Sequence, residues 1–170
     1  EVGHTFGEKV EEVLVEKLVE LDGRFTAPDN KREMQDVSFN DDLINIKFGF
    51  DKKGQPNMVA FNRLSTRYLK GEIDSYYIIS IDGKTNTVTL FDLYQQLPYT
   101  NYNVGTGQVM LKEKQFFSQF DQKKDYSLSK YTIINTMRQM KLQSHKDHIK
   151  LKEEQLKKSL ELFDKTLSLY

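Results

Sequence analysis

Hydrophobic and polar residues alternate most clearly in two short segments on either side of Asp41 and Asp42. A period of two is typical of strands that bury one face and expose the other. We therefore predict a β-hairpin over residues 35–48, with Asp41-Asp42 as its turn. Its hydrophobic face would be formed by Val37, Phe39, Ile44, Ile46 and Phe48.

The polar face of this hairpin carries its candidate chemistry. With the turn at residues 41 and 42, facing residues have numbers that sum to 83. That register predicts Asp36 opposite Lys47 and Ser38 opposite Asn45. A carboxylate and an ammonium would then meet on a rigid sheet, as a metal-dependent phosphodiesterase requires. The alternative is an ordinary surface ion pair, which contributes little to stability.

Hydrophobic residues recur at helical spacing on both sides of the hairpin. Residues 5–23 and 58–71 each repeat apolar positions three and four apart, which predicts two helices. Two β-rich runs follow, at 75–81 and 87–91. The order helix, hairpin, helix, strand, strand predicts an α+β fold in which a mixed four-stranded sheet is flanked by helices.

The C-terminal part of the chain is predicted to be helical. Ser127 can cap one helix that runs to about Leu142, and Ser144 can cap a second that continues nearly to the last residue. We divide the chain into a core, 1–126, and a C-terminal helical hairpin or extension, 127–170. The second helix has an apolar stripe that would pack back on the core or pair with a partner, as in a homodimer. The stripe consists of Ile149, Leu156, Leu160, Phe163 and Leu167.

The hairpin resembles the active-site motif of the PD-(D/E)xK nuclease superfamily, which includes most type II restriction endonucleases. Members place an Asp on one strand and an acid-x-Lys tripeptide on the next. Here Asp36 and Asn45-Ile46-Lys47 occupy these positions. Gln35 stands where the family often has Pro, and Asn45 stands where it usually has Asp or Glu. An amide oxygen can contact a hard cation but carries no charge, so another carboxylate has to compensate or the site is inactive.

A first-helix glutamate could supply that charge, because members of this family often take a metal ligand from there. At about 100° per residue, Glu11 falls on the border of the hydrophobic stripe, whereas Glu12 and Glu16 point away from it. The resemblance therefore assigns the ligand role to Glu11, with Glu8 one turn earlier as the substitute. The alternative is that each is a solvated helix charge.

The resemblance implies a Mg²⁺-dependent endodeoxyribonuclease of the restriction type, acting on double-stranded DNA. Asp36 and Glu11 would bind Mg²⁺ together with the carbonyl oxygen of Ile46. Lys47 would orient the attacking water or offset charge in the transition state. Because Asn45 replaces an acid, the alternative is a non-catalytic DNA-binding or protein-interaction module on a degenerate nuclease fold. We expect no organic cofactor, since phosphate-binding and dinucleotide motifs do not occur in the sequence.

Several polar side chains outside the hairpin are candidates for DNA contact. Arg63 and Arg67 lie on the polar side of the second predicted helix and can bind phosphate oxygens. Asn101 and Asn103 belong to a predicted loop rich in Tyr, Asn and Gly, and Gln108 follows it. Their amides could read base edges. The alternatives are a solvated helix surface and a plain connecting loop.

Composition limits the remaining classes of function. The 170 residues, 38% of them hydrophobic, are enough for a buried core. The absence of cysteine excludes disulfides, thiol catalysis and cysteine-rich zinc sites. The net charge is zero, but residues 1–104 carry 12 basic against 17 acidic residues (−5) and residues 105–170 carry 13 against 8 (+5). Such a division suits an enzyme that binds cations and phosphates side by side, or a solvated basic helix. No apolar run is as long as a membrane span, so we expect a soluble, cytoplasmic protein without membrane contact.

Overall fold

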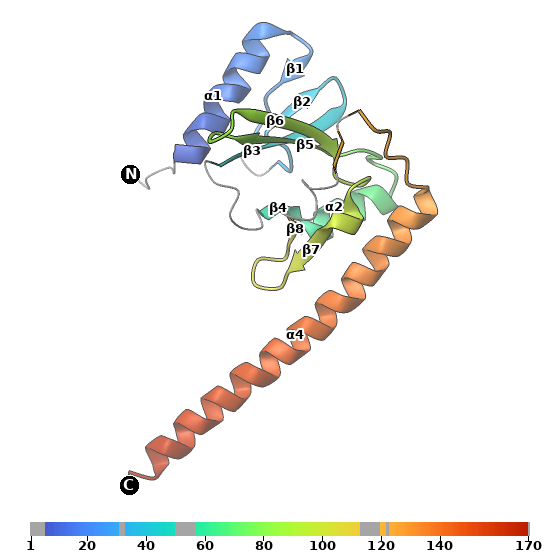
Figure 1. Ribbon diagram of the computed structural model, residues 1–170. Coiled ribbons are helices and arrows are strands. Elements are labelled where there is room, and N and C mark those ends of the chain that lie inside the picture. The colour runs from blue at the N-terminus through green and yellow to red at the C-terminus, as the bar shows by residue number, and fades with distance from the viewer. Residues whose placement is uncertain (1–5, 31–32, 50–56, 113–119, 122, 170) are drawn as a thin grey trace.

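A computed structural model describes residues 6–30, 33–49, 57–112, 120, 121 and 123–169 (Figure 1). The described chain combines a mixed five-stranded sheet, a second sheet of three strands and a long C-terminal helix. The predicted α+β class is therefore confirmed.

The five-stranded sheet has the order β1-β2-β3-β5-β6. Its strands are β1 (Phe25–Thr26), β2 (Val37–Phe39), β3 (Asp42–Gly49), β5 (Tyr77–Asp82) and β6 (Thr87–Asp92). The strands β3 and β5 run parallel and the other neighbours run antiparallel, which makes the sheet mixed. Strands β2 and β3 correspond to the predicted hairpin, and β5 and β6 correspond to the two predicted β-rich runs. Strand β1 was not predicted from the sequence.

The predicted register of the β2-β3 hairpin is wrong by two residues. The turn residues are Asn40 and Asp41, and Asn40 has a φ of 51°, a conformation that Asn tolerates better than most residues. Asp36 therefore does not face Lys47, and Ser38 does not face Asn45. Because a shift of two preserves the alternation, the polar residues still share one face of the hairpin. The observed pairs are Val37–Ile44, Ser38–Leu43 and Phe39–Asp42, with sums of 81.

Helix α1 (Phe6–Leu21) covers one face of the five-stranded sheet (Figure 1). The side chains that pack against the sheet are Leu14, Val15 and Leu18, which contact a cluster formed by Val37, Ile44 and Ile46. The hydrophobic stripe predicted from the sequence was Phe6, Val10, Val13, Leu14 and Leu21. Because Val13 and Leu21 are exposed, the buried face of α1 is rotated relative to that stripe. With this rotation, Glu11 lies one turn before Leu14 and Val15 on the face that meets the sheet.

The opposite face of the sheet packs on a second layer. This layer contains α2 (Phe61–Leu69), a short 3₁₀ helix η1 (Leu97–Tyr99), and a sheet with the order β4-β8-β7. Its strands are β4 (Asn57–Ala60), β7 (Thr100–Asn103) and β8 (Gln108–Leu111). The largest fully buried side chains between the layers include Tyr76, Tyr94, Phe61, Leu64 and Ile78.

Two sequence predictions fail in this second layer. Met58 was predicted to be helical but lies in β4, because residues 57–60 bond to β8 and the helix begins only at Phe61. The segment predicted as a loop contains β7, which forms an antiparallel hairpin with β8. Local spacing does not reveal either pairing, since the partner strands are distant or short.

The C-terminal region is one helix, α4 (Lys130–Leu167), rather than the two predicted helices. Ser129, not Ser127, caps it by accepting a hydrogen bond of 3.2 Å from the backbone N–H of Thr132. The hydroxyl of Ser144 donates to the carbonyl of its own helix at Lys141 and so does not interrupt α4. The region is thus an extension and not a hairpin, while the domain boundary at residue 126 stays a prediction.

Only the first half of α4 packs on the rest of the protein. Ile133, Met137 and Ser144 are buried, whereas every residue from Lys152 to Leu169 is exposed. Figure 1 shows the helix leaving the two sheets beside α2 and extending away from them. Within the described residues, none of the helices is both long enough and apolar enough to cross a membrane.

Candidate active site

The candidate site lies at the edge of β3 that β2 leaves uncovered. Strand β2 pairs only with residues 42–44 of β3. Beyond this point, Asp36 accepts a hydrogen bond from the backbone N–H of Ile46 (Oδ2 to N, 2.6 Å). Glu11 accepts one from the N–H of Phe48 (Oε1 to N, 3.0 Å). The two carboxylates thus take the place of a neighbouring strand and satisfy part-buried N–H groups.

The carbonyl oxygen of Ile46 belongs to the same edge. In a strand, the N–H and C=O of one residue point to the same side, which is why paired residues exchange both bonds. The N–H of Ile46 is bonded to Asp36, so its C=O also faces this edge, between the N–H groups that Asp36 and Glu11 bind. The structure therefore brings together Asp36, Glu11 and Ile46, although it corrects the register from which their meeting was predicted.

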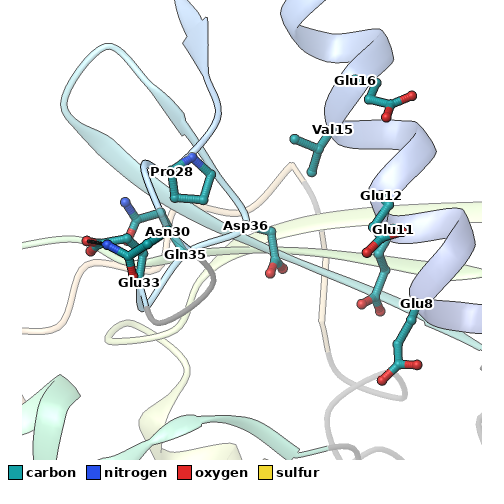
Figure 2. A pocket seen from close by; sticks show the side chains of 10 residues that line it. All are labelled: Glu8, Glu11, Glu12, Val15, Glu16, Pro28, Asn30, Glu33, Gln35 and Asp36. Atoms are coloured by element: carbon teal, nitrogen blue, oxygen red, sulfur yellow. Dashed lines mark hydrogen bonds between the residues drawn. The ribbon is translucent and has the colours of Figure 1, made fainter. Parts of the chain in front are cut away.

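A pocket of about 450 Å³ opens between α1 and the segment that leads into β2. Figure 2 shows Asp36 on one wall and Glu11 and Glu8 on the other. Glu12 and Glu16, which were predicted to point away from the hydrophobic stripe of the helix, also line this pocket. The full lining consists of Glu8, Glu11, Glu12, Val15, Glu16, Pro28, Asn30, Glu33, Gln35 and Asp36.

The pKa of Glu11 is raised above its ordinary value, chiefly because burial removes water from the carboxylate. The negative charges of Asp36 and Glu8 raise it further, while the ammonium of Lys47 and the N–H of Phe48 lower it. Lys47 is therefore within electrostatic reach of Glu11. A cation at this edge would favour the charged form of Glu11, because it would offset both the lost hydration and the neighbouring carboxylates.

Asn45 and Lys47 share the face of β3 opposite to α1. Asn45 is only 6% exposed, and its Oδ1 has no hydrogen-bond partner among the described residues. Its amide is hydrogen-bonded to the hydroxyl of Tyr76, which donates to the carbonyl of Met34. Burial raises the pKa of Tyr76, so this hydroxyl stays protonated. Sequence analysis did not identify Tyr76 as a residue of the site, because it is only one member of a β-rich run there.

Glu33 is a second residue that the sequence interpretation missed. It lines the same pocket as Asp36, on the same side as Asn30 and Gln35 (Figure 2), and accepts a hydrogen bond from Asn30 (3.1 Å). The sequence contains no signal for it, because its position depends on how the chain before β2 folds back.

The predicted DNA-contact residues fall into two groups. Arg63 and Arg67 of α2 lower the pKa of Tyr76 electrostatically, which places them on the same side of the large sheet as Tyr76. Arg67 also forms an ion pair with Glu72 (3.3 Å). The second group lies in the small sheet, in the layer that packs on the face of the large sheet opposite to α1.

That second group consists of Asn101, Asn103 and Gln108. The side chain of Asn103 is engaged in the β7-β8 turn, where its Oδ1 accepts hydrogen bonds from the backbone N–H groups of Gly105 and Thr106. Gln108 pairs with Asn103 across the hairpin. The segment is thus a structured hairpin and not the open loop that was predicted, which weakens its use for reading bases.

The donor set at the β3 edge fits a hard cation. Among the described residues, no three His, Cys, Asp or Glu side chains cluster closely enough to hold a metal ion by themselves. Two carboxylates and a backbone carbonyl remain, all of them oxygen ligands. Mg²⁺ commonly binds through one or two carboxylates and keeps several waters, so this set suits Mg²⁺ better than a metal that needs a complete protein cage.

Comparisons with known proteins add no assignment to this geometry. No family model matches the chain, and no curated protein matches it at a significant level. The function therefore has to be inferred from the arrangement of residues at the β3 edge.

Proposed function

We propose that the protein is a Mg²⁺-dependent endodeoxyribonuclease of the restriction type that hydrolyses phosphodiester bonds of double-stranded DNA. One observation carries the proposal. Asp36 and Glu11, 25 positions apart in the sequence, both bind the edge of β3 beside the carbonyl of Ile46, and Lys47 follows directly in the same strand. Oxygen ligands that can hold a divalent cation, with a lysine beside them on β3, suit the hydrolysis of a phosphodiester by a metal-bound water.

Asp36, Glu11 and the Ile46 carbonyl would hold the cation. When bound, Mg²⁺ supplies a Lewis acid that polarises a phosphate oxygen and lowers the pKa of a bound water. The protein contributes orientation, because each carboxylate is already fixed by a backbone N–H of β3. A preorganised pair of ligands loses little conformational freedom when a metal binds.

Lys47 would act on the reacting phosphate. Its ammonium lies within electrostatic reach of Glu11, so it belongs to the same local environment as the acids. A lysine presents a compact charge with three donors, which suits the orientation of a water or the stabilisation of charge that develops on the phosphate. Its removal should therefore affect the rate more than the affinity for DNA.

The acidic lining of the pocket has a consequence for DNA binding. Besides Glu11 and Asp36, four glutamates line it, and without a cation they repel a phosphate group. Productive binding of DNA near this edge should therefore require a divalent cation. The arginines on α2, Arg63 and Arg67, would then contact the flanking phosphates.

The second candidate function is a non-catalytic DNA-binding or protein-interaction module. It is favoured by the fact that Asp36 and Glu11 already serve as hydrogen-bond acceptors for the uncovered edge of β3. Such carboxylates would be needed for the fold even if no metal bound. The neutral Asn45, buried against Tyr76, agrees with the loss of an acid from this strand.

Incubation with phage DNA separates the two functions. With Mg²⁺, we expect the protein to give discrete fragments with 5′-phosphate ends, and we expect EDTA to abolish them. Asp36→Asn should be inactive, whereas Asp41→Asn, at an exposed turn position, serves as the control and should keep most of the activity. Cleavage that survives Asp36→Asn would refute the proposal, as would intact DNA under all divalent cations tested.

A further inference from the structure

The outer half of α4 carries large hydrophobic side chains that no other described element covers. Ile149 and Leu156 are each 60% exposed, Leu160 is 51%, Phe163 is 66% and Leu167 is 70%. This part of the helix extends away from both sheets (Figure 1). A helix that stays alone in water normally has no such stripe, so these side chains indicate an interaction surface.

The spacing of these residues is that of a coiled coil. Leu142, Ile149, Leu156 and Phe163 recur every seven positions, and Leu160 and Leu167 each follow one of them by four. These spacings define the d and a positions of a heptad, the two that form the seam between paired helices. The a positions before Leu160 are charged, Lys146 and Glu153, so the seam is strongest toward the end of α4.

We propose that this face, residues 146–167 of α4, binds the same face of a second copy of the chain in an antiparallel coiled coil. A parallel pair would place Glu153 against Glu153 and Lys146 against Lys146 in the seam. It would also place Lys152 of one copy beside Lys157 of the other at the flanking g and e positions. These like charges oppose parallel pairing.

Antiparallel pairing removes these conflicts. When Leu156 of one copy meets Leu160 of the other, Ile149 meets Leu167, and between these two hydrophobic layers Glu153 of each copy lies opposite Phe163 of the other instead of opposite a second Glu153. The flanking e positions then bring Lys150 of each copy next to Asp164 of the other. Among the charged pairs at the flanking positions, one is repulsive, between the two Lys157 side chains at the axis, and two are attractive.

The area available agrees with a weak but specific dimer. Five exposed side chains per copy, at roughly 100 Å² each, would bury roughly 1,000 Å² in total. This value lies at the lower limit for specific interfaces. We therefore expect a dimer whose population depends on protein concentration in the micromolar range.

Sedimentation of the full chain over a concentration series tests the surface. The chain should shift from monomer to dimer as its concentration rises. Leu156→Glu places a charge in the seam and should leave only monomer. Lys158→Glu, at a position opposite to the seam, is the control and should dimerise like the original chain. A monomer at all concentrations, or a dimer that persists in Leu156→Glu, would overturn the proposal.

Charge exchange tests the orientation. Lys150→Glu and Asp164→Lys should each weaken dimerisation, by roughly 5-fold for two surface ion pairs, and the double variant should recover it. In a parallel pair these two residues do not meet, so the double variant would be no better than the single ones. That result would overturn the antiparallel arrangement. Circular dichroism checks that each variant folds, which is expected because all the changed positions are exposed.

Discussion

A part-buried carboxylate at the end of β6 gives the sharpest test of how the large sheet is held together. One oxygen of Asp92 accepts hydrogen bonds from the backbone N–H groups of Tyr76 (3.2 Å) and Tyr94 (3.0 Å). Burial nevertheless raises the pKa of Asp92 to about 6, because the lost hydration outweighs these two bonds. The residue matters for the site, since it fixes the backbone of Tyr76.

The pKa shift fixes the sign of its effect on stability. The folded protein binds the proton of Asp92 more tightly than the unfolded chain does, so this carboxyl favours folding at low pH. The contribution is complete below the ordinary value of 3.8 and is lost as the pH rises through about 6. A shift of roughly 2 units corresponds to about 3 kcal/mol in full, and to about 2 kcal/mol between pH 4 and pH 7.

Asp92→Asn removes the charge and keeps an acceptor oxygen for the two N–H groups. Urea unfolding at several values between pH 4 and pH 7 measures the free energy of unfolding of both proteins. We expect the free energy of unfolding of the variant, relative to that of the original protein, to increase by about 2 kcal/mol from pH 4 to pH 7. Asp41→Asn, at an exposed position, should show no such trend. If the free energies of unfolding of Asp92→Asn and of the original protein follow the same pH dependence, folding does not raise the pKa of Asp92.

Three further substitutions test the site itself. Lys47→Ala should abolish DNA cleavage and leave DNA affinity, measured by gel shift, within several-fold; full activity would remove Lys47 from the mechanism. Asn45→Asp places a carboxylate where Asn45 is 6% exposed, so urea unfolding at pH 7 should show a loss of roughly 2 kcal/mol or more, and an unchanged stability would contradict the burial. Tyr76→Phe removes the donor to the Met34 carbonyl and should cost about 1–3 kcal/mol by the same assay; a neutral effect would mean that water replaces the hydroxyl.

Four of the five strands of the large sheet could be predicted from alternation and from β-rich runs, but the register of the β2-β3 hairpin could not. A shift of two residues leaves Val37, Ile44 and Ile46 on the same face. The observed register, in which the numbers of facing residues sum to 81, and the predicted one, in which they sum to 83, therefore bury the same side chains. The turn decides between them, because Asn40 adopts the positive φ that the observed connection requires. A hydrophobic pattern alone carries no information about that choice.

The second sheet and the continuity of α4 could not be predicted from local sequence patterns for a related reason. Met58 and Phe61 have helical spacing, yet the pairing of β4 with the distant β8 makes residues 57–60 a strand. Ser144 resembles a helix cap in the sequence, whereas its hydroxyl bonds within a continuous helix. Tertiary pairing and the partner of a single hydroxyl are set by the whole fold.

The candidate site was predictable in part. Helical geometry correctly placed Glu11, and not Glu12, nearest to the sheet, since the N–H of Phe48 bonds to it. The positions of two other site residues depend on tertiary packing and could not be predicted from the sequence. They are Glu33, which joins the acidic pocket through the fold of the preceding segment, and Tyr76, which contacts Asn45 across β3 and β5.

Calorimetric titration with Mg²⁺ tests whether the carboxylates at the β3 edge form a metal site. We predict that the chain binds one Mg²⁺ at the β3 edge. Glu11→Gln should lose this binding while keeping its stability, because a glutamine oxygen still accepts the N–H of Phe48. Asp36→Asn should also lose binding, and Glu12→Gln, an exposed neighbour on the same helix, should retain it. Wild-type Mg²⁺ binding by Glu11→Gln and Asp36→Asn, or no binding by the original chain, would contradict the account and leave these carboxylates with only a structural role.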